Sequence, residues 1–250
     1  MSVVLEGKKL YKNFDGIKAV DDFSFSIEEN RIVSLIGPNG SGKTTLFNII
    51  TGFLEPDGGE VLFKGKPVLD EPPHKIANLG IGRTFQNLRL LQKVSVLDNV
   101  LLAFKNQSGE KLFGVYFGLK NRNEQGKNKE KALSFLEFVG LSEKAEDLAE
   151  NLSYGQQKLL TLACCLAMDA ELLLLDEPVA GLSPVMIGKM FGMIKDLQKQ
   201  GKTIFFIEHN LKVVMEISDK VIVIDEGKKI AEGEPSIIKE DSKVIEAYLD

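Results

Sequence analysis

The sequence has few of the features that mark secreted, zinc-binding or membrane-spanning chains. Its only two cysteines, Cys164 and Cys165, are neighbours inside an apolar helical pattern. Because neighbouring helical residues point in different directions, we expect two reduced, buried thiols rather than a disulfide or a cysteine-based zinc site. The longest apolar runs, such as LLTLACCLAM, are far shorter than the roughly 18 to 20 residues that a membrane span needs.

A signal sequence and a general nucleic-acid-binding surface are also not expected. The N-terminal stretch MSVVLEGKKLYKNF lacks a basic segment followed by an apolar core. The 36 acidic residues outnumber the 31 Lys and Arg residues, which gives a net charge of −5 and leaves room only for a local basic patch. We therefore predict a soluble, cytosolic chain with no nucleic-acid partner.

Apolar strand-like runs alternate with helical patterns along the chain. The N-terminal part reads as short strands, and the clearest strand candidates are 22–29, 31–37, 60–68, 79–86, 171–177, 202–210 and 220–233. Helical patterns cover 96–104, 129–141, 155–168, 185–201 and 211–218. The alternation predicts an α/β fold with a mostly parallel sheet covered on both faces, and the mostly helical middle predicts an insertion. Within it, residues 106–131 are polar and poorly periodic, which predicts an irregular loop or a short helix.

The stretch GPNGSGKTT, residues 37–45, matches the phosphate-loop pattern G-x-x-x-x-G-K-[ST] between a buried strand and a helix. Glycines let consecutive backbone N–H groups point at an anion, and the following helix adds its positive N-terminal end. We expect Lys43 to reach the β- and γ-phosphates of a nucleotide and the Thr44 hydroxyl to hold Mg²⁺. A glycine-rich turn without a ligand is the weaker explanation in this context.

The stretch LLLLDEP, residues 172–178, predicts a strand buried on both faces that ends in two acids. Asp176 would emerge at the carboxyl end of the strand, where open α/β sheets bind ligands, and can hold Mg²⁺ directly or through water. Glu177 can polarise a water for in-line attack on a γ-phosphate. The alternative, a strand end with two solvated acids, is disfavoured by the phosphate loop in the same chain.

The stretch NLSYGQQKLLTLA, residues 151–163, contains no general base, nucleophile or metal-binding cluster. Ser153 and Gly155 stand directly before an amphipathic helical run, which suggests a surface that holds an anion.

Taken in order, these motifs resemble those of ABC-transporter ATP-binding subunits. The matching stretches cover essentially the whole chain: 37–45, Gln86 in RTFQN, LSYGQQ, LLLLDEP, AGLSP, and His209 in IEHN. The resemblance implies a P-loop NTPase with a RecA-like α/β core, an antiparallel β-subdomain and an inserted helical subdomain. It also implies one ABC ATP-binding domain over 1–250, with the core and β-subdomain in 1–86 and 169–250 and the helical subdomain in 87–168.

The resemblance implies roles for individual residues. ATP would be bound through its phosphates by Gly37, Pro38, Asn39, Gly40, Ser41, Gly42, Lys43, Thr44 and Thr45. Mg²⁺ would be held by Thr44, Gln86 and Asp176. The catalytic group would be Glu177, His209, Gln86 and Lys43, with His209 hydrogen-bonded to the γ-phosphate. Phe14 would stack on adenine, although Phe14 is equally compatible with a place in the core and neighbouring Tyr11 is a rival.

In the family, the signature loop binds the γ-phosphate of an ATP that another subunit holds. Here this role falls to Ser153, Gly155 and Gln156 at the start of a helix, an anion site used in trans. The resemblance therefore implies a head-to-tail dimer of identical or paralogous subunits with two ATPs at its interface. The usual signature has glycine where this chain has Tyr154, which raises the question of whether a glycine-specific backbone angle is needed there.

The resemblance further implies a motor subunit at the cytoplasmic face of the cell membrane, bound peripherally to transmembrane permease subunits. A substrate-binding protein is a further candidate partner. The stretch GIGRTFQNLRLLQKVSVLDNVLLA, the tyrosine-containing signature and AGLSP are similar to the branched-chain amino acid import subfamily. The alternatives are an exporter or lipid-extraction ATPase, and a soluble ABC protein acting on ribosomes or DNA. We expect residues 87–95 to be partly exposed and to contact the permease.

Overall fold

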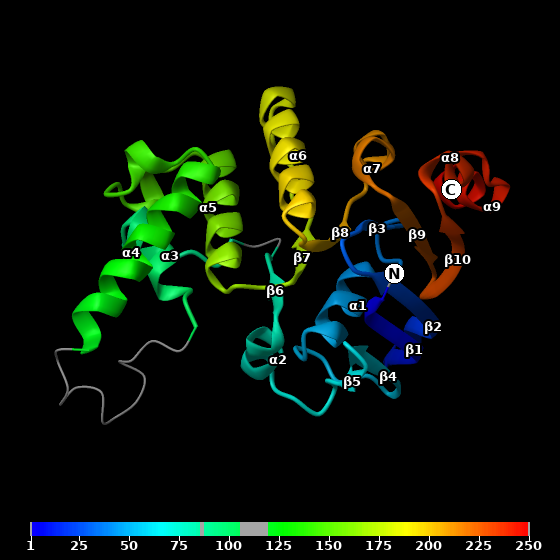
Figure 1. Cartoon of the computed structure of the whole chain (residues 1–250). Coiled ribbons are helices and arrows are strands. Elements are labelled where there is room, and N and C mark those ends of the chain that lie inside the picture. Colours follow the sequence, from blue (N-terminus) through cyan, green and yellow to red (C-terminus); the bar gives the residue numbers. More distant parts are fainter. Residues whose placement is uncertain (1, 86–87, 106–119, 250) are drawn as a thin grey trace.

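The computed structural model describes residues 2–85, 88–105 and 120–249, with the backbone alone for 120–125 and 249, and Figure 1 shows its sheets and helices. A six-stranded sheet has the order β10-β9-β3-β8-β7-β6. Its strands are β3 (Ile32–Ile36), β6 (Ile81–Arg83), β7 (Leu172–Asp176), β8 (Thr203–Ile207), β9 (Lys220–Asp225) and β10 (Lys228–Gly233). Only β10 pairs antiparallel, which confirms the predicted mostly parallel sheet.

The central strands are apolar on both faces because the sheet is covered on both sides. Every residue of β3, β7 and β8 is buried. Along β7, Leu173 and Leu175 belong to the core that includes α5, α6 and α7, whereas Leu172 and Leu174 belong to the core that includes α1. Successive strand side chains point to opposite faces, so a run of leucines is the expected sequence here.

A second, four-stranded antiparallel sheet has the order β2-β1-β4-β5 and shares the core of α1. Its strands are β1 (Val3–Phe14), β2 (Ile17–Glu28), β4 (Gly58–Phe63) and β5 (Lys66–Pro67). The first two strands are longer than the short strands predicted. Several register shifts interrupt the β1–β2 pairing, and each shift breaks the regular apolar–polar alternation on which the prediction depends.

The remaining elements are helices, which fall into two groups in Figure 1. Those near the sheets are α1 (Lys43–Ile50), α2 (Pro73–Leu79), α6 (Pro184–Lys199), α7 (Leu211–Ile217), α8 (Pro235–Glu240) and α9 (Ser242–Leu249). The helical group on the other side of β6 is α3 (Val96–Leu102), α4 (Lys120–Phe138) and α5 (Tyr154–Ala167), with 3₁₀ turns at 142–144 and 149–151. This group is inserted between β6 and β7, which are neighbours in the sheet, as the sequence predicted.

Three predicted elements have different bounds in the structure. Of the strand expected over 79–86, the described residues 79–85 form only β6, and the strand expected over 60–68 is a hairpin of β4 and β5 that turns at Lys64 and Gly65. Helix α4 begins at residue 120, inside the segment for which a loop or short helix was predicted. Residues 126–131 are mostly exposed and carry no apolar stripe, so hydrophobic periodicity could not reveal this part of the helix.

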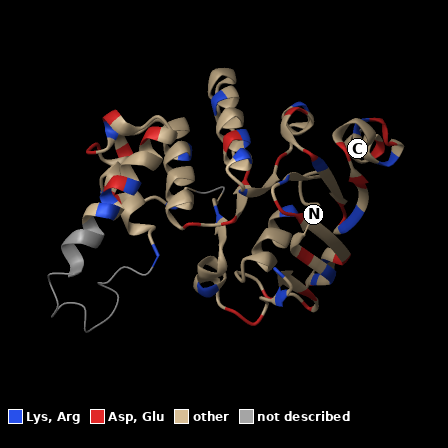
Figure 2. Ribbon diagram, in the orientation of Figure 1, with Lys and Arg blue, Asp and Glu red and all other residues tan. Residues whose placement is uncertain are grey.

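Positive and negative side chains are interspersed over both the sheet region and the helical group in Figure 2. Among the described residues, no helix combines the length and the apolar composition needed to cross a membrane.

Candidate active site

Three polar segments meet at one edge of the six-stranded sheet because parallel strands end on the same side. β3 leads into the phosphate loop, β7 into Asp176 and Glu177, and β8 into Glu208 and His209. The register brings Asp176 opposite Ile207, and the Glu208 amide donates to the Leu35 carbonyl at 3.4 Å. The topology therefore assembles most of the predicted site from distant parts of the sequence.

The phosphate loop requires glycine at two positions where backbone from elsewhere approaches closely. A Cβ at Gly37 would lie 1.9 Å from the Ile224 carbonyl oxygen. A Cβ at Gly42 would lie 2.1 Å from the Ala19 carbonyl oxygen, and the φ of Gly42 is 107°, in the left-handed region. β2 and β9 thus fix the shape of the loop through close backbone contacts.

Lys43 opens α1 and has its ammonium folded into the loop. Its Nζ donates to the Gly37 carbonyl at 2.8 Å and to the Pro38 carbonyl at 2.7 Å, and the residue is buried. Burial lowers the pKa of Lys43, while the charges of Glu177 and Asp176 act in the opposite direction. The charge of Lys43 in the phosphate loop therefore interacts with the charges of the two acids at the carboxyl end of β7.

Asp176 is paired with Arg83, a residue that the sequence analysis did not single out. Arg83 Nη2 donates to Asp176 Oδ2 at 3.1 Å, and the two side chains are 4% and 3% exposed. Arg83 Nη1 donates to Asn48 Oδ1 and Thr51 Oγ1, both at 2.9 Å, which ties the pair to the end of α1. Burial raises the pKa of Asp176, and the charge of Arg83 offsets part of that effect. The sequence did contain a signal for this pair, because Arg83 is a cation inside the mostly apolar run IGRTF, and a buried cation needs a partner.

Glu177 has a left-handed backbone, with a φ of 47°. Its amide donates to the Ile207 carbonyl at 3.1 Å, and its carbonyl accepts a short hydrogen bond from the Lys158 ammonium. His209 Nδ1 lies 3.7 Å from Glu177 Oε1, and the His209 side chain is 56% exposed. The structure therefore brings together three of the predicted catalytic residues, Lys43, Glu177 and His209.

Glu208 is a further acid that the sequence analysis missed. It is 1% exposed, and its carboxylate accepts from the Val179 amide at 3.2 Å and from the His209 amide at 3.3 Å. Burial raises the pKa of Glu208, which the two amide hydrogen bonds and the charge of His209 counteract. It holds the end of β8 against the segment after β7.

The donor set at this edge fits a nucleoside triphosphate with Mg²⁺. The Thr44 hydroxyl is exposed at the start of α1, and the Asp176 carboxylate is close enough to affect Lys43, so the oxygen ligands that Mg²⁺ prefers are present. The phosphate loop adds the Lys43 ammonium, an exposed segment at Asn39 and Gly40, and the positive end of α1. The predicted ligand Gln86 lies outside the described residues.

The signature residues form a helix start elsewhere on the chain. Ser153 caps α5, with its Oγ accepting from the Gln156 amide at 3.4 Å, and the Gln156 side chain accepts from the Ser153 amide at 2.9 Å. Tyr154 is the first helical residue and has no positive φ, so this backbone does not require glycine there. A Cβ at Gly155 would lie 3.2 Å from Leu182, which favours glycine by space.

Helices α5 and α1 lie far apart in Figure 1, with β6 and β7 between them. The structure of one chain therefore does not bring the helix of Ser153, Gly155 and Gln156 to the helix of Lys43. Phe14 is also separate, at the end of β1, where the residue is 44% exposed and the centre of its ring lies 5.7 Å from the Lys12 ammonium. Its rival Tyr11 is hydrogen-bonded to Asp22, which raises the pKa of Tyr11.

The segment expected to be partly exposed, 87–95, is so over its described residues 88–95, which confirms the expected exposure there. Arg89 is exposed yet stacks on Phe85, with its guanidinium carbon 3.7 Å from the ring centre, and Arg83 lies on the same ring at 4.7 Å. Two hollows of ≈ 270 Å³ and ≈ 340 Å³ share Arg83, Phe85 and Met168 in their walls.

Comparison with known proteins gives a consistent result. The family profile "ABC transporter" matches residues 20–180. The probable branched-chain amino acid transport ATP-binding protein LivG of Archaeoglobus fulgidus is 41% identical over 98% of this chain and 95% of its own. The high-affinity branched-chain amino acid transport ATP-binding proteins BraF of Pseudomonas aeruginosa and LivG of Escherichia coli are each 40% identical, over 98% and 96% of this chain and 97% and 95% of their own.

Solved structures agree in fold. A nucleotide-free ATP-binding cassette from an ABC transporter superposes with a TM-score of 0.86 at 34% identity, covering 100% of both chains. A dimeric bacterial ABC transporter cassette superposes with a TM-score of 0.79 at 25% identity, covering 92% of this chain and 98% of the other. The phosphate loop, the acids after β7 and these relatives together assign the chain: it belongs to the ABC transporter family and is an ATPase of that family.

Proposed function

We propose that this chain is the ATP-hydrolysing motor subunit of a branched-chain amino acid importer. The observation that carries the chemistry is the convergence of Lys43, Glu177 and His209 at one sheet edge, where His209 Nδ1 is 3.7 Å from Glu177 Oε1. The transport assignment is supported by the names of relatives that are about as long as this chain and 40–41% identical to it.

In this mechanism the phosphate loop and Lys43 bind the β- and γ-phosphates through backbone N–H groups and the ammonium. Thr44, Gln86 and Asp176 would hold Mg²⁺, which would supply positive charge to the phosphate oxygens. Glu177 accepts a proton from the attacking water, and His209, exposed beside it, hydrogen-bonds the γ-phosphate. Phe14, exposed at the end of β1, stacks on adenine.

The other part of each site comes from a second ATP-binding subunit, a copy of this chain or a paralogue. Ser153, Gly155 and Gln156 present the start of α5 to the γ-phosphate bound by that subunit. The distance between α5 and α1 in Figure 1 supports this arrangement, and so does the dimeric cassette with a similar fold.

Residues 87–168 form, in this proposal, a helical unit that moves against the parts 1–86 and 169–250. Its described edge 88–95 and the two hollows that Phe85 lines receive the permease at the cytoplasmic face of the membrane. A substrate-binding protein would deliver the amino acid on the far side. The alternatives of an exporter and of a soluble ABC ATPase predict other partners on this edge.

The test is uptake of radiolabelled leucine by vesicles that contain this chain and the permease with which it co-purifies. Glu177→Gln should abolish ATP-driven uptake and lower ATP hydrolysis about 10²- to 10⁴-fold, because a positioned base contributes that much. Glu171→Gln, at the exposed opposite end of β7, is the matched control and should keep both. Hydrolysis near the wild-type rate in folded Glu177→Gln protein, or co-purification with soluble partners alone, would contradict the proposal.

A further inference from the structure

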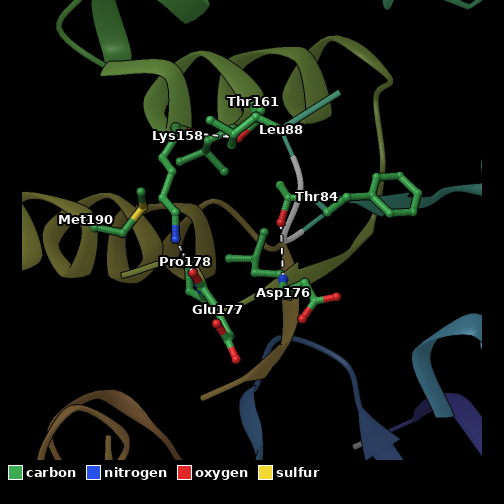
Figure 3. A pocket seen from close by; sticks show the side chains of 11 residues that line it. Thr84, Leu88, Lys158, Thr161, Asp176, Glu177, Pro178 and Met190 are labelled. Atoms are coloured by element: carbon green, nitrogen blue, oxygen red, sulfur yellow. Dashed lines mark hydrogen bonds between the residues drawn. The ribbon is translucent and has the colours of Figure 1, made fainter. Parts of the chain in front are cut away.

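Lys158 is a buried cation on α5 that lies five residues after Ser153 and points at Glu177. The residue is 6% exposed, and its ammonium donates to the Glu177 backbone carbonyl (Figure 3). Its neighbour Thr161 donates to the Lys158 carbonyl at 2.7 Å, within the same helix. The motif match gives Lys158 no role, and burying a lysine is costly unless its charge is used.

Three carboxylates balance the charge of Lys158. Burial lowers its pKa, and the charges of Glu208, Glu177 and Asp176, in this order, act against that effect. All three acids stand at the ends of β7 and β8, so the ammonium reaches from the helical group into the acidic edge of the sheet. Its hydrogen bond, however, goes to a backbone oxygen rather than to a carboxylate.

The backbone that Lys158 holds has an unusual conformation. Glu177 has a φ of 47°, a left-handed conformation that is unfavourable for a residue with a Cβ. Its amide is fixed by the Ile207 carbonyl at 3.1 Å, so the Lys158 hydrogen bond fixes the other end of the same residue. The direction of the Glu177 side chain depends on this backbone, because φ sets where the Cα–Cβ bond points.

Lys158 is also in contact with the start of its own helix. Its Nζ lies 5.4 Å from the centre of the Tyr154 ring, and that ring would meet a Cβ at Gly181 at 3.0 Å. Tyr154 therefore packs between the lysine and the segment that follows Glu177. The first turn of α5, Lys158 and Glu177 form a continuous set of contacts.

We propose that Lys158 is a positioning residue that clamps Glu177 in its left-handed conformation and connects the start of α5 to that acid. The inference rests on the proposed function, in which the start of α5 binds the ATP of the second subunit. When the start of α5 contacts that phosphate, the contact affects the position of Glu177, the water-activating acid, through Lys158. Each chain links the two nucleotide sites of the dimer through this contact.

The activity test compares purified Lys158→Met, Lys158→Arg and wild-type protein over a range of Mg²⁺-ATP concentrations. Lys158→Met should lower kcat about ten- to a hundredfold, as small misplacements of a reacting group do, and should change KM for ATP less than about threefold. Lys158→Arg should recover most of the loss. Lys202→Met is the matched control, because Lys202 also donates to a backbone carbonyl, that of Ala170 at 2.7 Å, and it should keep kcat.

A second measurement does not depend on activity and covers the case in which Lys158→Met folds poorly. Lys158→Met should lower the urea midpoint less in a Glu177→Ala background than in a Glu177→Gly background. Once the Lys158 hydrogen bond is removed, alanine at position 177 can leave the left-handed region, and the relief of backbone strain offsets part of the lost stability. Glycine at position 177 is not strained in that region, so nothing offsets the loss. Equal shifts in the two backgrounds would overturn the proposal.

The outcomes separate this inference from the proposed function. Wild-type protein that binds no ATP and does not hydrolyse it would end the proposed function, and the urea comparison would still decide on the clamp. Wild-type hydrolysis together with unchanged kcat in Lys158→Met would overturn the inference alone. A parallel loss of kcat and stability that Lys158→Arg does not recover would also contradict it, because that is the pattern of a merely structural residue.

Discussion

The sheet edge and the start of α5 are both proposed to contact a phosphate, but they are built in opposite ways. At the sheet edge, Lys43, Arg83 and Asp176 are buried and their charges are balanced within the chain. At the start of α5, Ser153 and Tyr154 are exposed, and a capping box holds the helix end. The polar groups of the sheet edge are balanced by partners within the chain, whereas the start of α5 is exposed and free to contact a second chain. A site shared between two chains requires this difference.

The largest effect should come from removing the internal balance at the sheet edge. Arg83→Met leaves the Asp176 carboxylate buried without its cation, which should cost about 3–5 kcal/mol of unfolding free energy. Lys64→Met, which removes the exposed partner of Glu171, should cost less than about 1 kcal/mol. Denaturant unfolding of the two variants measures both values, and equal costs would break the contrast between the buried and exposed regions.

The same substitution has a predictable pH dependence. Burial already raises the pKa of Asp176 in the folded chain above its ordinary value of 3.8. The unfolded chain therefore loses this proton at a lower pH, and the stability of the fold decreases as the pH rises above 3.8. Removing Arg83 raises that pKa further, because the cation that lowered it is gone. The stability deficit of Arg83→Met should therefore grow from pH 4 to pH 7, and it should not grow in an Asp176→Asn background.

An aromatic contact outside both regions should have a smaller effect. Phe14→Ala should weaken ATP binding by about 1–3 kcal/mol, the contribution of stacking on a base, without unfolding the chain. Tyr11→Phe, which removes only the hydroxyl bonded to Asp22, serves as the control. Calorimetry measures both affinities, and an unchanged affinity in Phe14→Ala would assign adenine stacking elsewhere.

The exposed helix start can be separated from an ordinary helix cap. Ser153→Ala removes the serine that caps α5, and Ser95→Ala removes the serine that caps α3. Each substitution should cost about 1 kcal/mol of stability. Only Ser153→Ala should also slow ATP hydrolysis, because only that cap is proposed to face the second nucleotide. If the two variants hydrolyse ATP at the same rate, the start of α5 is merely a cap.

The smallest effect on ATP hydrolysis should come from the 88–95 edge. Charge reversal at Arg89 or Lys93 should reduce permease assembly or ATP-driven transport while basal hydrolysis stays within about twofold, since exposed charges contribute little to stability. Lys199→Glu, on the exposed end of α6, is the control. Transport at the wild-type rate in the reversed variants would remove this edge as the docking surface.

The sequence predicted the parts of this molecule that depend on local pattern. Buried strands such as LLLLD follow from an unbroken apolar run, and the glycine loop follows from close backbone approaches at Gly37 and Gly42. The Arg83–Asp176 pair was not predicted, because it joins residues 93 positions apart. The Lys158–Glu177 hydrogen bond was missed for a different reason, since nothing in a helical pattern shows which way a lysine points.

The most direct test of the shared site is the mass of Glu177→Gln protein with and without saturating Mg²⁺-ATP, measured by light scattering. The account predicts one chain of 27.6 kDa without ATP and a dimer with ATP, because the start of α5 closes on a nucleotide that is no longer hydrolysed. Adding Ser153→Arg should abolish the ATP-dependent dimer. Protein that binds ATP fully and remains at the mass of one chain, both alone and when mixed with the ATP-binding subunit that co-purifies with it, would contradict the account.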